Sequence, residues 1–174
     1  MLDEKRIKEA EQNVRTYLND GLLKKEPFNI NIHNVLVKNA HESLEIAEFL
    51  LEHQKSDLWI IVTSYYSMYY MANAILYNVG YKVGEKISHK VTADSLIIFI
   101  RNKLKKSVIE EYEKAQEIAL AGIKADSLLE TFDREREKRS TVQYETKEFE
   151  LHGKAKTSLQ RAKEFIFEIE KILL

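Results

Sequence analysis

The sequence predicts an all-α protein, an up-and-down bundle of five to six helices in a single domain. The length of 174 residues suits one domain and buries enough surface for a core without disulfides or metals. One proline and five glycines are too few for a many-stranded sandwich or barrel, which needs a turn about every 8 to 12 residues. Apolar residues recur at three- and four-residue steps, and no strand-like alternation of useful length is found.

The first two helices follow from this spacing. An amphipathic first helix is expected to end near Asp20–Gly21, and residues 1–26 are expected to form an N-terminal helical extension. A connector over residues 22–31 then leads to a second helix over about 32–53.

The third helix is expected at the centre of the bundle. Residues 58–81 carry no charge and are long enough to span a bilayer, but they include six tyrosines together with serine and asparagine side chains. A helix that is apolar nearly all round also suits the centre of a soluble bundle. We therefore expect a buried helix that Ser56 caps and that ends at Gly80, and no contact with a membrane.

The remaining helices are marked by capping patterns. A loop from Gly80 leads to Ser88, which can cap a fourth helix. Ser107 and Glu110 form a capping box for a fifth helix that Gly122 can interrupt, and a second capping box follows at 127–130. A polar connector over residues 140–145 precedes the last helix.

Charge and cysteine content exclude several function classes. The 27 Lys and Arg nearly balance the 28 Asp and Glu, so any nucleic-acid role needs a local basic patch. The absence of cysteine excludes disulfides, thiolate metal sites and cysteine nucleophiles. The charged start has no apolar signal-peptide core, so we expect a cytoplasmic protein.

Metal chemistry is not expected either. Carboxylate-bridged iron in a helix bundle needs Glu-x-x-His on each of two helices, and this pattern does not occur in the sequence. The zinc pattern His-Glu-x-x-His is also absent. We expect no metal site and no cofactor.

Four tyrosines cluster in the central segment, at positions 65, 66, 69 and 70. They could form a surface for stacking on a base or binding a phosphate. Alternatively, Tyr65 and Tyr69 face the core while Tyr66 and Tyr70 face a neighbouring helix or subunit, since tyrosine combines apolar area with a polar tip. The second interpretation is favoured.

A charged run over residues 133–139 ends in Arg139. Its glutamates and arginines stand in the i,i+4 order that stabilises a solvated helix, which is the simpler interpretation. Alternatively, Arg139 offers its guanidinium group to a phosphate or carboxylate.

Three segments form a recognisable series: the tyrosine-rich helix over Ser64–Leu76, then Ser88-His89-Lys90, and finally Arg139-Ser-Thr-Val-Gln-Tyr144. Together they resemble the HEPN superfamily (higher eukaryotes and prokaryotes nucleotide-binding). The resemblance implies a helical bundle, commonly a homodimer whose arginine motifs meet across a cleft. It also implies nucleotide or RNA binding, or association with a nucleotidyltransferase-type protein in a toxin–antitoxin arrangement.

Some members of that family are metal-independent endoribonucleases with an arginine, a polar residue and a histidine after four to six intervening positions. By that resemblance Arg139, Ser140 and Tyr144 are the candidate catalytic residues, but Tyr144 stands where the histidine is expected. Tyrosine, with an ordinary pKa near 10, is a poor base at neutral pH, and losing the base lowers the rate by roughly 10²–10⁴-fold. His89 could replace it if the fold brought His89 near Arg139.

Two function classes therefore remain. The first is a HEPN-type nucleotide-, RNA- or partner-binding module, with Arg139, Tyr66, Tyr70 and His89 as the candidate ligand-binding residues. The second is a toxin-like, metal-independent endoribonuclease that uses the same cleft. The missing histidine favours the binding module.

Overall fold

The structure is a computed structural model that describes the backbone of residues 2–132 and 141–173 and the side chains of residues 2–123 and 150–173. Within these ranges the protein is an all-α bundle of six helices with one small two-stranded sheet, which confirms the predicted fold class. In chain order the elements are α1 (Glu4–Asn19), β1 (Leu23–Lys25), α2 (Ile30–Glu52), α3 (Asp57–Asn78), β2 (Tyr81–Val83), α4 (Ser88–Phe99), the 3-10 turn η1 (Arg101–Lys103), α5 (Lys106–Phe132) and α6 (Thr141–Leu173).

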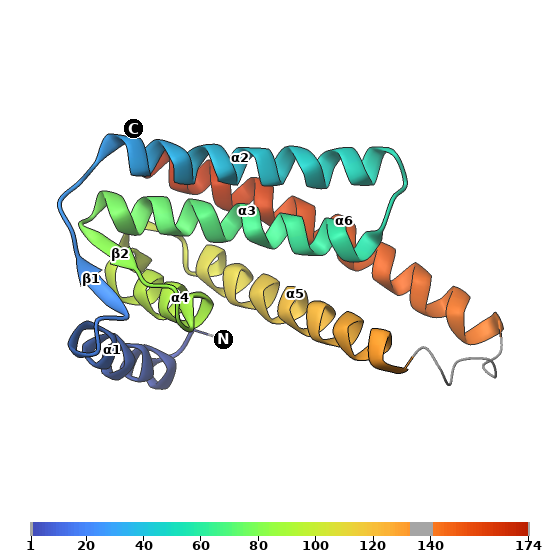
Figure 1. Cartoon of the computed structure of the whole chain (residues 1–174), viewed down its shortest axis with the longest axis horizontal. Coiled ribbons are helices and arrows are strands. Elements are labelled where there is room, and N and C mark those ends of the chain that lie inside the picture. Colours follow the sequence, from blue (N-terminus) through green and yellow to red (C-terminus); the bar gives the residue numbers. More distant parts are fainter. Residues whose placement is uncertain (1, 133–140, 174) are drawn as a thin grey trace.

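Helix α3 lies at the centre of the bundle, as predicted. Helices α2 and α6 pack along one side of it, and α4 and α5 pack along the other (Figure 1). Thirteen of its 22 residues are buried, so the uncharged stretch forms the core rather than a surface. Among the helices within the described ranges, none is both long and apolar enough to cross a membrane.

Both ends of α3 follow the predicted signals. The Ser56 Oγ accepts a hydrogen bond from the Trp59 backbone N–H at 3.4 Å, which satisfies one of the free donors of the first turn. At the other end, Gly80 follows the C-cap with a φ of +91°, a conformation that glycine adopts without strain.

The two short strands were not predicted. β1 and β2 pair antiparallel, with Leu23 opposite Val83 and Lys25 opposite Tyr81. Three residues are too few to show the two-residue period of a strand, and the partners lie far apart in the sequence, in segments predicted as connector and loop. The Tyr81 ring stacks on Phe99 of α4 with centroids 4.0 Å apart, which attaches this ribbon to the bundle.

Several predicted helix boundaries were wrong. α5 begins at Lys106, so Ser107 lies inside its first turn, and the helix then runs without a break through Gly122 and the second capping box. A glycine within a helix costs only about 1 kcal/mol, which packing can offset. Here a Cβ on Gly122 would meet the Leu58 Cδ1 at 2.8 Å, so glycine lets α5 approach α3 closely. α6 begins at Thr141, within the predicted connector.

Helix α1 is held to the bundle by a buried carboxylate. Asp94 of α4 is fully buried and accepts hydrogen bonds from the Tyr17 hydroxyl at 2.8 Å and the Asn13 side chain at 3.0 Å. Arg6 forms an ion pair with Asp94 at 2.6 Å and also binds Glu113 of α5 at 2.8 Å. Burial alone would lower the pKa of Arg6, but the two carboxylates outweigh it and raise that pKa above its usual value.

We expect Asp94→Ala to lower the free energy of unfolding by about 3 kcal/mol or more, because it leaves Arg6 and Tyr17 without their buried partner. Glu113→Gln is the matched control, since its partly exposed ion pair contributes at most about 1 kcal/mol. Urea denaturation followed by circular dichroism measures both. If Asp94→Ala does not fold, Tyr17→Phe should still cost about 1 kcal/mol. An Asp94→Ala protein as stable as wild type would contradict this role.

Candidate functional site

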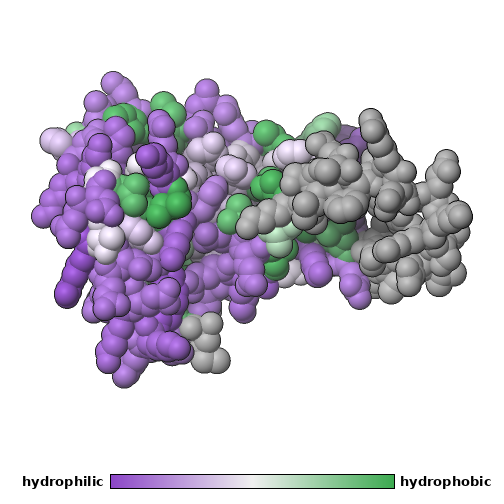
Figure 2. Space-filling view, turned by 60° about the horizontal axis from the view of Figure 1, so that its bottom comes forward, coloured by the Kyte–Doolittle hydropathy of each residue, from purple (hydrophilic) through white to green (hydrophobic). Residues whose placement is uncertain are grey.

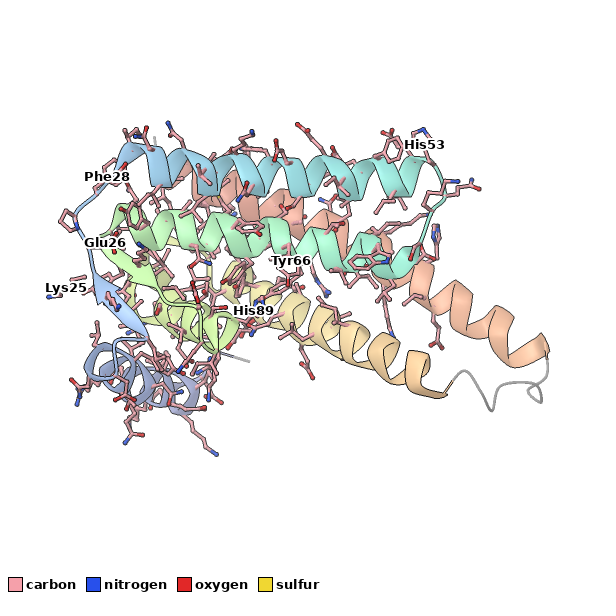
Figure 3. The ribbon with its side chains drawn as sticks, in the orientation of Figure 1. Lys25, Glu26, Phe28, His53, Tyr66 and His89 are labelled. Atoms are coloured by element: carbon pink, nitrogen blue, oxygen red, sulfur yellow. The ribbon has the colours of Figure 1, made fainter. Side chains whose placement is uncertain are left out.

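Three tyrosines of α3 and one histidine of α4 form a cluster, which we call the tyrosine–histidine cluster: Tyr65, Tyr66, Tyr69 and His89. The Tyr65 hydroxyl and the His89 Nδ1 are 2.8 Å apart, within hydrogen-bond distance. The Tyr69 and Tyr66 rings lie 4.5 Å and 5.8 Å from the imidazole, measured between ring centroids. Figure 3 shows His89 beside Tyr66, close to the middle of α3.

A second polar contact fixes the position of α4 against α3. One turn beyond the cluster, the Asn73 side chain donates to the Thr92 Oγ1 at 3.3 Å. The Thr92 hydroxyl in turn donates to the Ser88 carbonyl at 2.9 Å, which holds the first turn of α4. The two helices therefore hold His89 in place through contacts on both sides of it.

The cluster is buried at one end and open at the other. Tyr65 is buried, whereas Tyr66, Tyr69 and His89 are half-buried. Tyr70 is also half-buried, with its ring 6.1 Å from that of Tyr66. The predicted division holds for Tyr65, Tyr66 and Tyr70, but Tyr69 keeps part of its surface exposed because it packs on the half-buried His89.

Burial controls the protonation of the cluster. It lowers the pKa of His89 below its usual value, so the imidazole is neutral at pH 7. Burial also raises the pKa of Tyr65 well above its usual value, so its hydroxyl keeps its proton. The direction of the Tyr65–His89 hydrogen bond depends on the imidazole tautomer. In the tautomer whose Nδ1 accepts from Tyr65, His89 carries its proton on Nε2, where it can donate to a phosphate or to the edge of a base.

Arg139 and Ser140 lie outside the described residues. Tyr144 belongs to the first turn of α6, and its side chain also lies outside them. On α6, Tyr144 lies eight residues before His152, whose Nδ1 is 2.9 Å from the Asp57 carboxylate at the start of α3. On α3, Tyr66 lies nine residues after Asp57, on the opposite side of this contact. At 1.5 Å per residue, Tyr144 and Tyr66 are about 25 Å apart along the bundle.

The structure therefore brings Tyr66, Tyr70 and His89 together but leaves Tyr144 of the same chain at a distance. In Figure 1 the first turns of α6 extend beyond the start of α3, which agrees with this separation. Sequence reasoning missed Tyr65 and Tyr69 as partners of His89. The only signal was the tyrosine spacing, which places these two residues on one face of α3.

Among the described side chains, no three His, Asp or Glu residues are grouped as metal ligands would be. No protein-family model and no curated protein matches the chain.

The protonation of His89 has a consequence for stability. The unfolded chain protonates this imidazole with the ordinary pKa near 6.5, whereas the folded protein does so only at lower pH. As the pH falls below about 6.5 the unfolded state thus binds more protons, and His89 lowers the free energy of unfolding. We expect His89→Gln to lose less stability than wild type between pH 7.5 and pH 5.5 in urea titrations.

An NMR titration of the imidazole protons tests the same point directly. A pKa of His89 at or above the ordinary value would contradict the burial argument.

Proposed function

We propose that this protein is a nucleotide- or RNA-binding module of the HEPN type and that its tyrosine–histidine cluster holds a base. The observation that supports this most is the half-buried pair of rings, Tyr66 and Tyr69, which pack against each other and against His89. Every base has a flat face, so partly open aromatic side chains bind single-stranded nucleic acid with little sequence preference.

One tautomer of His89, which we include in the proposal, favours binding over cleavage. Cleaving RNA without a metal requires a base that takes the proton of the 2′-hydroxyl. His89 has no free lone pair when Nδ1 accepts from Tyr65 and Nε2 carries the proton. Tyr144 also replaces the histidine of the ribonuclease motif. We therefore propose a donor role for His89 and treat RNA cleavage as the alternative outcome of the test below.

The proposal includes a homodimer, or a complex with a nucleotidyltransferase-type protein, in the cytoplasm. Three large apolar side chains near the α2–α3 connection, Ile46, Phe49 and Trp59, are about half exposed. Exposed apolar residues of this size mark contact surfaces when they occur together. A second copy of the chain is the occupant we propose, and two copies would supply two Arg139 side chains to one assembly.

Binding is tested by fluorescence anisotropy with a labelled single-stranded RNA of mixed sequence, in EDTA. We expect Tyr66→Ala to weaken binding roughly 5- to 100-fold, because one stacked base is worth about 1 to 3 kcal/mol. Tyr66→Phe should retain binding, since the ring remains. Phe167→Ala on α6 removes an exposed aromatic ring elsewhere and should have no effect.

Arg139→Ala in the same assay should abolish binding with little loss of helicity. If that variant instead unfolds or loses its dimer, Arg139 has a structural role and the site assignment is wrong. Cleavage of the RNA by wild type but not by Arg139→Ala would establish the ribonuclease. Failure of wild type to bind RNA or nucleotides would contradict the proposal as a whole.

A further inference from the structure

Two lysines lie directly opposite each other in the β-ribbon. Lys24 of β1 and Lys82 of β2 are cross-strand partners, and both are exposed. Side chains at such positions begin about 5 Å apart, and like charges there destabilise a sheet. The pair therefore brings two positive charges together on one face of the ribbon.

More positive charge follows along the chain. Lys86 and Lys90 are exposed in the segment that leads from β2 into α4. We call Lys24, Lys82, Lys86 and Lys90 the lysine track. Two acidic residues lie near it: Glu26, which binds the Lys82 Nζ at 3.0 Å, and the exposed Glu85.

The lysine track ends next to His89 of the tyrosine–histidine cluster in the sequence. Lys90 is the neighbour of His89 in the first turn of α4, and His89 is seven residues beyond Lys82. That segment can span at most about 25 Å when fully extended. Figure 3 shows His89 close to the middle of α3, and Lys25 on β1 at the end of the bundle where α1 lies. The surface at this end is predominantly hydrophilic (Figure 2).

We infer that the lysine track binds the phosphates of a single-stranded RNA whose bases stack on Tyr66 and Tyr69. This rests on the proposed function and names its ligand more closely. A basic path beside aromatic platforms is the arrangement by which single strands are held. Bases in a duplex are already stacked on one another, so the open rings favour a single strand. The chain as a whole is nearly neutral and does not attract a polyanion, so RNA binding requires a local basic patch of this kind.

The first test is the dependence of binding on salt. For single strands, each phosphate contact contributes about −0.7 to the slope of log K against log salt concentration. We expect Lys24→Gln/Lys82→Gln to reduce the slope by about 1.4 and to weaken binding roughly 20-fold at 0.1 M KCl. Lys38→Gln/Lys163→Gln removes the same charge from exposed positions on α2 and α6, and should change neither quantity.

Two single variants separate binding from stability. Lys24→Glu places opposite charges across the ribbon, so its thermal midpoint should equal or exceed that of wild type while its affinity for RNA falls. Glu26→Gln releases Lys82 from its ion pair and should raise the affinity several-fold. If the lysines had only a structural role, Lys24→Glu would not lower the affinity for RNA and Glu26→Gln would not raise it.

The outcomes distinguish this inference from the proposed function. If wild type binds RNA and the Lys24→Gln/Lys82→Gln variant binds with the same affinity and the same salt slope, the lysine track is overturned and the binding function stands. If a duplex binds as tightly as the single strand of equal length, the single-strand assignment is overturned. If wild type binds no RNA, both proposals fail together.

Discussion

The structure depends on the need to cover helix α3. After Asp57 its sequence carries no charge and presents apolar side chains in nearly every direction, and each exposed methylene group would cost about 0.8 kcal/mol. Four other helices therefore pack around it, and a stripe in its middle part stays at least partly exposed: Trp59, Thr63, Tyr66, Tyr69, Tyr70 and Asn73. Each of these positions lies three or four residues from another, so they share one side of the helix. The candidate site lies in the middle of that stripe.

Helix α4 connects this stripe to the N-terminal helix. On its α3 side it presents His89 to the tyrosines and Thr92 to Asn73. On its α1 side it presents the buried Asp94 to Arg6 and Tyr17. Because Asp94 is only five residues from His89 on a 12-residue helix, the contacts of α1 help to fix the element that carries the imidazole. The N-terminal extension expected from the sequence is thus joined to the site through α4.

The backbone before His89 is unusual. Ile87 precedes α4 with a φ of +44°, a left-handed conformation that is rare for a β-branched residue. The sequence predicted Ser88 as the cap of this helix, but Ser88 is its first residue, and Ile87 has no side-chain hydrogen bond to offer at the cap position. The tight turn brings the chain from β2 into the first turn of α4, where His89 meets the tyrosines.

Much of the fold could be predicted from the sequence because helical spacing repeats over long segments. The central helix and the caps at Ser56 and Gly80 follow from local signals alone. The β-ribbon could not be predicted, because three residues show no period. The role of Asp94 was missed, although a single carboxylate within an apolar stretch of α4 is a signal that a buried partner exists.

The candidate site could be predicted only in its components. Tyr66, Tyr70 and His89 were identified as separate residues, but the contact between α3 and α4 depends on the loop that joins them and on packing, which local patterns do not encode. The arginine motif was identified by resemblance, and Arg139 lies outside the described residues. The lysine pair at positions 24 and 82 is visible only once the strand register is known.

The central claim is that bases lie against the tyrosine–histidine cluster, and photo-crosslinking tests it most directly. A single-stranded RNA carrying 4-thiouridine is irradiated with the wild-type protein, and the crosslinked peptides are identified by mass spectrometry. Our account predicts crosslinks in the segment that contains Tyr66 and Tyr69 or in the one that contains His89. Crosslinks confined to α1 or to the outer face of α2, or none at all, would contradict it.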